Sequence, residues 1–334
     1  MLMTSKSLTC DELNIPLLLR PAGKDYLWGG TRLQEEYGKC TELEIVAESW
    51  ECSTHPAGLS RIVNGPWQGH SLKEYLEQNP RVLGRHEGNP YGIPVLVKLI
   101  DADKDLSLQV HPDDDFALEH EDECGKTELW YVLDAAPGAE LIYGFSHDIT
   151  EEQLRKCVED GSIVNHVQRI PVRRDDVFFV RPGTIHAIGA GVLLAEIQQS
   201  SDVTYRVFDY HRIDKNGSPR PLHVDKAVQV MDRKAAPMVR QQMRLLRYIP
   251  GAAWESLCRC PYFHVDRMLL SRQIQWEVPE NNFQILLVTI GDLRLDYADG
   301  REALQITKGD CVFVPAGMGK IGLRGNGQFL RISC

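Results

Sequence analysis

The hydrophobic residues of this chain occur mostly in short stretches that are bounded by glycine, proline and aspartate. Stretches of this length, rich in β-branched and aromatic residues, predict strands rather than helices. The clearest examples cover residues 93–100, 128–133, 139–145, 176–180, 283–290 and 310–315. The pattern therefore predicts a mainly β protein whose strands build a barrel or sandwich.

Helical patterns are fewer and shorter. They cover residues 113–123, where an acidic opening suits a helix N-terminus, and residues 150–160 and 222–232. We expect the strands to be interrupted by short helical insertions, one of them around residues 147–170.

The chain contains one internal repeat. The segment from Asp176 to His186, DVFFVRPGTIH, aligns without a gap with DCVFVPAGMGK from Asp310 to Lys320. Such self-similarity indicates a duplicated β unit. A segment rich in glycine, proline and polar residues, 212–221, and a helical stretch precede the second copy. We therefore expect an N-terminal domain over residues 1–235 and a C-terminal domain over 236–334.

The two copies differ at positions that carry chemistry. Lys320 stands where the first copy has His186, and a looser alignment of the preceding hairpin sets Gln284 opposite Glu128. The C-terminal domain is thus predicted to be a degenerate copy that binds no metal.

Composition narrows the function classes. The chain has 334 residues, about twice the usual single-domain size. Its net charge of −10 argues against binding to nucleic acid or anionic membranes, which rests on basic surfaces. No stretch approaches the roughly 18 apolar residues of a membrane span. Nine scattered cysteines and an N-terminus without a secretion signal favour reduced thiols and the cytoplasm.

Polar side chains share faces on two predicted strands. Alternation along a strand places Ser107, Gln109 and His111 on one face, and Lys126 and Glu128 share a face at the start of the next strand. These residues predict a polar stripe inside the β body.

A third segment, the turn Arg181–His186, can bring His186 back beside His111 and Glu128. His111, His186 and Glu128, with an amide oxygen from Gln109, form a nitrogen and oxygen ligand set that suits Zn²⁺ and leaves a coordination position open. Such an open site indicates catalysis. Two histidines and one carboxylate also suit Fe(II), as in oxygenases.

A fourth segment contains both a carboxylate and a guanidinium. Glu196 lies ten residues after His186 and can face the same interior, and a loop of small polar residues leads from it to Arg206. The proton carrier of any reaction stays open among Glu196, Lys126 and a metal-bound water.

Several of these motifs together resemble the type I mannose-6-phosphate isomerases (phosphomannose isomerases) in their short bacterial form. The similarity extends from about residue 18 to residue 230 and rests on DYLWGG (25–30), AESWECSTHPAG (47–58), SLQVHP (107–112), GKTELWYVL (125–133), FVRPGTIHAIGAG (179–191) and EIQQSSDVTYRVFDY (196–210). The resemblance implies two cupin-type, jelly-roll β-barrels with short helical insertions.

It also implies a function, the reversible conversion of mannose 6-phosphate to fructose 6-phosphate through a cis-enediol. The family's residues fall on Gln109, His111, Glu128 and His186 as ligands of one zinc ion per chain, on Arg206 as the active-site arginine, and on Ser107 and Lys126 near the substrate phosphate and reacting carbons. We expect Arg206, Lys126 and Glu196 to serve catalysis, and the chain to act as a monomer or homodimer. The alternatives are a sugar-phosphate sensor without turnover and a cupin metalloenzyme of other chemistry.

Overall fold

The computed structural model describes residues 15–89, 92–214, 217–239, 241 and 243–334. Contacts between Cα atoms divide the chain into two compact units, and neither is one continuous stretch of sequence. One unit combines the segment that ends at Arg20 with Leu59–Pro94 and Arg244–Cys334, and the other combines Pro21–Gly58 with Val95–Met243. The domain boundary expected at residue 235 stays a prediction.

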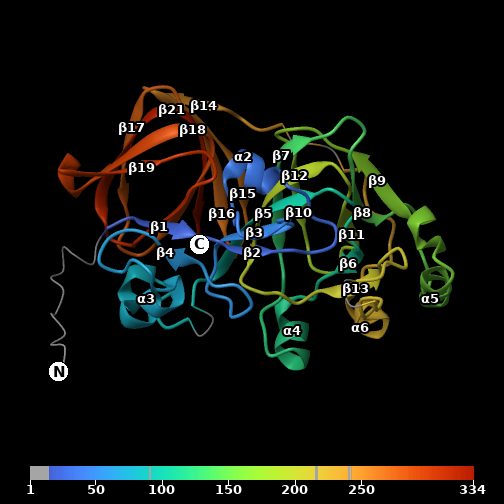
Figure 1. Ribbon diagram of the computed structural model, residues 1–334. Coiled ribbons are helices and arrows are strands. Elements are labelled where there is room, and N and C mark those ends of the chain that lie inside the picture. The colour runs from blue at the N-terminus through green and yellow to red at the C-terminus, as the bar shows by residue number, and fades with distance from the viewer. Residues whose placement is uncertain (1–14, 90–91, 215–216, 240, 242) are drawn as a thin grey trace. The chain divides into compact units, whose positions relative to one another are not determined.

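The first unit is built on a ten-stranded sheet that contains both ends of the described chain (Figure 1). Its main path is β14-β15-β16-β21-β18-β20-β1-β4, with β17 on β21 and β19 on β18. The strands are β1 (Leu17–Arg20), β4 (Arg61–Ile62), β14 (Arg247–Ile249), β15 (Ala252–Arg259), β16 (His264–Leu270), β17 (Gln273–Val278), β18 (Gln284–Tyr297), β19 (Glu302–Ile306), β20 (Cys311–Val314) and β21 (Gly319–Ser333). The helices of this unit are α3 (Leu72–Gln78) and the 3₁₀ turns η1 (Pro80–Leu83) and η3 (Ala298–Gly300).

The second unit contains two antiparallel sheets. The six-stranded sheet has the order β10-β7-β12-β5-β3-β2, with β2 (Ala22–Lys24), β3 (Glu48–Cys52), β5 (Val95–Ala102), β7 (Glu128–Ala135), β10 (Val177–Val180) and β12 (Val192–Gln199). The five-stranded sheet has the order β13-β6-β11-β8-β9, with β6 (Leu108–Val110), β8 (Glu140–Phe145), β9 (Val167–Pro171), β11 (His186–Ile188) and β13 (Tyr205–Phe208). Its helices are α2 (Arg32–Tyr37), α4 (Asp114–His120), α5 (Glu151–Glu159), η2 (Ser162–Asn165) and α6 (Val224–Val230).

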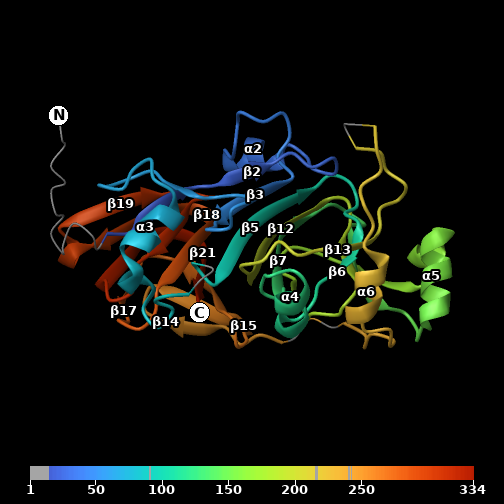
Figure 2. The ribbon, with the colours of Figure 1, turned by 90° about the horizontal axis from the view of Figure 1, so that it is seen from below.

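Apolar side chains fill the space between the two sheets of this unit. Trp130 and Leu194 of the six-stranded sheet pack in one cluster with Leu141 and Ile188 of the five-stranded sheet. A separate cluster joins the other face of the five-stranded sheet to α5 and α6. Figure 2 shows these two helices on the side of β13 and β6 that faces away from β7 and β12. The mainly β class predicted from the sequence is confirmed.

Helices α4, α5 and α6 form within the three stretches predicted to be helical. Thr150 and Gln153 make a reciprocal capping box at the start of α5, and Leu154, Cys157 and Val158 bury one face of that helix. Asp113 caps α4 by accepting a hydrogen bond from the Phe116 amide. None of the helices in the described part of the chain has the length and hydropathy of a membrane-spanning segment.

The internal repeat is confirmed at the level of strand register. Val180 pairs with Glu128 between β10 and β7, and Val314 pairs with Gln284 between β20 and β18. Val180 and Val314 are equivalent positions of the aligned segments. The looser alignment of Gln284 with Glu128 therefore has a structural counterpart in each unit.

Candidate metal centre and active site

Two histidines meet because β6 and β11 pair next to a tight turn. The register sets His186 opposite Gln109, and His111 follows Gln109 by two residues on the same face. The Gly183 amide donates to the His111 carbonyl at 2.9 Å, which ties the turn before β11 to the end of β6. Gly183 has φ +80°, and an added Cβ would lie 2.8 Å from the Val230 carbonyl oxygen, so this turn requires glycine. The ring centroids of the two histidines lie 4.8 Å apart.

Backbone carbonyls orient both imidazoles. Nδ1 of His111 lies 2.9 Å from the Val203 carbonyl oxygen, and Nδ1 of His186 lies 2.8 Å from that of Thr184. A carbonyl oxygen only accepts, so each Nδ1 carries the proton. Burial lowers the pKa of both rings, that of His111 to about 3 with a contribution from Lys126. Both rings are thus neutral, and each presents an Nε2 lone pair, which is how a metal-binding histidine is normally prepared.

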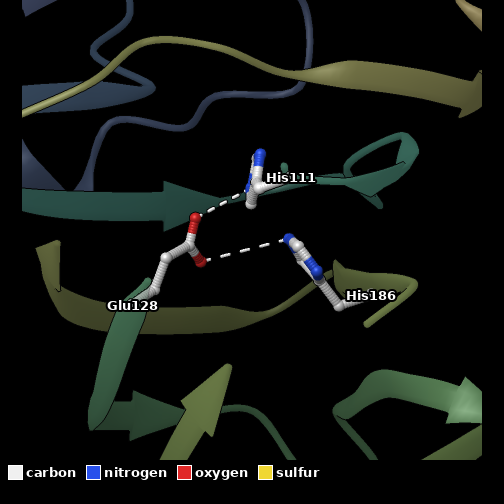
Figure 3. Close-up of side chains that lie close together, drawn as sticks. All are labelled: His111, Glu128 and His186. Atoms are coloured by element: carbon white, nitrogen blue, oxygen red, sulfur yellow. Dashed lines mark ion pairs between the residues drawn. The ribbon is translucent and has the colours of Figure 1, made fainter. Parts of the chain in front are cut away.

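Glu128, the first residue of β7, completes the group. Its Oε1 lies 2.8 Å from Nε2 of His111 and its Oε2 lies 4.0 Å from Nε2 of His186 (Figure 3). Burial by itself would raise the pKa of Glu128, but the positive charge of the Lys126 ammonium holds it well below its usual range. The carboxylate is therefore ionised although its side chain is fully buried.

These three residues have the chemistry of a cation site. The candidate ligand atoms all lie within 4.8 Å of one another. Neither oxygen of Glu128 has a hydrogen-bond partner among the described residues. A carboxylate oxygen that faces an unprotonated imidazole nitrogen at 2.8 Å sets two lone pairs against each other, and a shared cation relieves that repulsion. The residues therefore fit a divalent metal ion, and two nitrogens with one oxygen suit zinc.

Gln109 and Arg206 extend the site across the five-stranded sheet. Gln109 lies between His186 on β11 and Arg206 on β13, directly opposite each of them. Its amide nitrogen is 3.4 Å from Nε2 of His186, so half a turn of the amide would direct its oxygen to the same place. Three neighbouring strands thus carry one continuous row of polar side chains.

Arg206 is held by the backbone on one side only. Its Nη1 donates to the Pro221 carbonyl oxygen at 2.9 Å, and its buried Nε has no hydrogen-bond partner among the described residues. Burial and the nearby Arg220 guanidinium lower the pKa of Arg206. Arg220 and Arg212 share the carboxylate of Asp209. The end of the polar row therefore carries an excess of positive charge.

Lys126 and Ser107 lie close to the ligands in the chain. Nζ of Lys126 is 3.0 Å from Oε1 of Glu128 and 3.4 Å from Nε2 of His111. Its backbone amide donates to the Pro112 carbonyl at 3.0 Å, which holds the start of β7 beside the end of β6. Ser107 is buried directly before β6. The structure thus brings Lys126 into contact with the centre and places Ser107 on the segment that leads to Gln109.

Glu196 lies in the middle of β12, on the face that carries Glu128. Since Gln198 pairs with Glu128, Glu196 is one step further along the same face, opposite Trp130 and Lys98. Its Oε2 accepts a hydrogen bond of 2.8 Å from Nε1 of Trp130, and its Oε1 is 3.2 Å from Nζ of Lys98. Burial raises the pKa of Glu196, and the negative charge of Glu128 adds to this effect.

Lys98 belongs to this site although the sequence analysis did not select it. Its side chain is 3% exposed, and its Nζ also lies 3.5 Å from Oε2 of Glu48 and 4.9 Å from the ring centre of Trp50. Burial favours the neutral amine, but Glu48 and Glu196 raise the pKa of Lys98 above its ordinary value. The signal that was available is a single lysine within the apolar stretch IPVLVKLI, because a buried strand tolerates a charge only beside partners.

Comparisons with known proteins identify the family of this chain. Residues 17–133 match the model of the phosphomannose isomerase type I catalytic domain, and residues 255–334 match that of the mannose-6-phosphate isomerase cupin domain. The chain is 36% identical to mannose-6-phosphate isomerase ManA of Bacillus subtilis over 93% of its own length and 96% of that protein. It is also 36% identical to the mannose-6-phosphate isomerase of Streptococcus mutans, over 90% of this chain and 92% of that protein.

Solved structures give the same result. The crystal structure of the Bacillus subtilis mannose 6-phosphate isomerase superposes with a TM-score of 0.87 at 36% identity, over 96% of this chain and 99% of that one. A zinc-bound mannose 6-phosphate isomerase shares the fold with a TM-score of 0.74 at 17% identity, over 95% of this chain and 98% of that one. The cupin-type fold expected from the sequence is confirmed. The chain belongs to the type I mannose-6-phosphate isomerase family.

Proposed function

We propose that this chain interconverts mannose 6-phosphate and fructose 6-phosphate and binds one zinc ion through Gln109, His111, Glu128 and His186. The observation that carries the proposal is the buried group in which two neutral imidazoles direct lone pairs at an ionised carboxylate. The names of the Bacillus subtilis and Streptococcus mutans relatives support the activity, and the zinc-bound structure of the same fold supports the metal.

The main chemical task of such an isomerase is to stabilise an anionic enediolate. A bound divalent ion supplies a Lewis acid that favours negative charge on the substrate oxygens. Lys126 adds a fixed positive charge beside the ligands, because its ammonium lies 3.0 Å from Oε1 of Glu128. Ser107 and Lys126 contact the substrate in this proposal.

Arg206 binds the anionic end of the substrate. Its buried Nε has no hydrogen-bond partner among the described residues, so this guanidinium retains donor capacity for a further acceptor. The positive charge of Arg220 and Arg212 nearby favours an anion at this end of the site. A local excess of cations lets a protein with a net charge of −10 bind a phosphosugar.

Glu196 carries the proton between C1 and C2. A base needs a pKa closer to neutrality than that of a free carboxyl group, and burial beside Glu128 raises the pKa of Glu196 in that direction. Trp130 contacts one oxygen of Glu196 and Lys98 contacts the other. These contacts orient the carboxylate and limit its movement.

A coupled isomerase assay with metal analysis tests the proposal. We expect about one zinc per chain, activity that is lost with a chelator and restored by zinc, and exchange of the C2 hydrogen of mannose 6-phosphate with solvent deuterium. Activity that persists in metal-free protein contradicts the proposal. Binding of the phosphosugar without exchange would identify a sensor, and a requirement for iron and oxygen would identify another cupin chemistry.

We infer that the C-terminal domain, residues 236–334, does not bind the catalytic ion, because Gln284 and Lys320 replace Glu128 and His186 and Gln284 is bonded to Trp276 Nε1 at 2.8 Å. Every cysteine in the described part of the chain is a free thiol. Reduced thiols support a cytoplasmic location.

A further inference from the structure

A second group of metal-binding side chains lies at the base of the helical insertion, away from the candidate centre. Ser146 and His147 directly follow β8, and His166 lies between η2 and β9. The two ends of the insertion are neighbours because Phe145 pairs with Val167. His147 is exposed and His166 is half-buried, and the buried Cys157 of α5 contacts His166.

Hydrogen bonds determine the tautomer of His147. The Ser146 hydroxyl donates to the His166 carbonyl oxygen at 3.0 Å, because that oxygen can only accept. The same hydroxyl oxygen lies 3.0 Å from Nδ1 of His147, so Nδ1 must be the donor in this second contact. The neutral ring of His147 therefore has its lone pair on Nε2.

That lone pair faces a second imidazole nitrogen. Nε2 of His147 lies 3.0 Å from Nδ1 of His166, and the ring centroids lie 5.0 Å apart. On its other side, Nε2 of His166 lies 3.2 Å from the Cys157 sulfur. If the His166 proton resides on Nε2, the sulfur accepts it and both facing nitrogens present lone pairs. The change requires one tautomeric shift of the His166 ring.

The separation of these nitrogens matches chelation of one ion. Zinc–nitrogen bonds of about 2.0–2.1 Å, at angles between a right angle and the tetrahedral value, place two ligand nitrogens roughly 2.9–3.4 Å apart. We propose that His147 and His166 form a second, surface site for a divalent transition-metal ion, with Ser146 and Cys157 as the partners of the outward ring nitrogens. Such partners fix ligand orientation in known metal sites.

The ligand type defines the class of ion. Two imidazoles favour zinc, nickel, cobalt or copper, whereas magnesium and calcium require oxygen ligands. A bound ion would join residues that are 19 positions apart and would clamp both ends of the insertion that contains α5 and η2. The site shares no residue with the group of His111, Glu128 and His186, so the inference does not depend on the proposed function.

Calorimetric titration of the zinc-loaded protein with Ni²⁺ tests the proposal. We expect a saturable equivalent of Ni²⁺ in addition to the resident ion. His147→Ala and, separately, His166→Ala should weaken this binding roughly tenfold or more, because one of two ligands is lost. His120→Ala is the matched control, since His120 is a single exposed histidine whose Nδ1 is bonded to the Phe116 carbonyl. It should leave the binding unchanged.

His147 is exposed, so the His147→Ala substitution leaves the buried core intact. A loss of Ni²⁺ binding in this variant therefore reports on the site and not on misfolding. Isomerase activity of zinc-loaded His147→Ala should equal that of the unchanged protein. The proposal is overturned if the unchanged protein binds no additional Ni²⁺, or if His147→Ala binds it with the same affinity. It is also overturned if the additional binding disappears in His111→Ala but persists in His147→Ala.

Discussion

Oε1 of Glu128 lies 2.8 Å from Nε2 of His111, and neither atom carries a proton. The contact between two acceptors results from the Nδ1–H of His111, which donates to the Val203 carbonyl. It makes the centre suited to a cation rather than to a further acceptor.

His111→Ala and His186→Ala should each lose most of the bound zinc and reduce kcat/KM by about 1,000-fold or more, since the remaining ligands do not fill the coordination sphere. Metal analysis of the purified variants and the coupled assay measure the two effects. His120→Ala, which removes an exposed histidine, should change neither. A variant of His186 that keeps full zinc content and full turnover would exclude it as a ligand.

Glu196→Gln should reduce kcat by about 100- to 10,000-fold, the usual contribution of a general base, while the zinc content stays unchanged. The amide keeps an acceptor for Trp130 Nε1 but cannot take up a proton. Exchange of the substrate C2 hydrogen with solvent deuterium should fall in parallel with turnover. Full exchange in this variant would assign the proton transfer to another group.

Lys98→Met should move the acidic limb of the pH–kcat/KM profile to higher pH. The ammonium of Lys98 favours the charged form of Glu196, whereas burial and Glu128 favour the neutral form. Without Lys98 the pKa of Glu196 rises, and a larger share of the enzyme is protonated and inactive at a given acidic pH. An acidic limb that stays in place would show that Glu196 is not the titrating base.

The same variant should be less stable. Loss of Lys98 removes the ammonium beside the buried carboxylate of Glu196 and the half-buried carboxylate of Glu48, which costs about 3–5 kcal/mol of the free energy of unfolding. Denaturant unfolding of zinc-loaded protein measures this loss. Lys73→Met, which removes an exposed lysine of α3, is the control and should be neutral.

Arg206→Met should raise KM for the phosphosugar by about 10- to 100-fold, the value of a lost charge-assisted hydrogen bond. Arg206→Lys should recover part of the affinity, since the charge returns without the guanidinium geometry. Steady-state kinetics at two salt concentrations separate the contribution of the positive charge to KM from that of the guanidinium geometry. The exposed Arg155→Met on α5 should leave KM unaltered.

Leu154→Ala should destabilise the second unit by about 2–5 kcal/mol through the cavity that it leaves. Leu154 is fully buried between α5 and the five-stranded sheet. The candidate metal centre lies on the other face of that sheet, so turnover per folded molecule should not change. Thermal unfolding measures the loss of stability and the coupled assay measures turnover, each beside the exposed control Lys156→Ala.

The order of hydrophobic and polar residues was sufficient to predict the main strands and helices. Short apolar stretches rich in β-branched and aromatic residues predicted strands such as β5, β7 and β18, and helical patterns predicted α4 and α5, because these features depend on near neighbours in the chain. Alternation also grouped Gln109 with His111, and Lys126 with Glu128. The repeat predicted equivalent registers at Glu128 and Gln284, which the strand pairing confirms.

Tertiary structure alone decided which distant residues meet. The partners of Lys98 come from β3 and β12, and the direction of each imidazole depends on the carbonyls of Val203 and Thr184. Strand pairing between remote segments, including that of β1 with β20, leaves no local period in the sequence. Residue types and spacing therefore predicted the candidate ligands, whereas their protonation, charge partners and geometry follow from how separate strands are paired and buried.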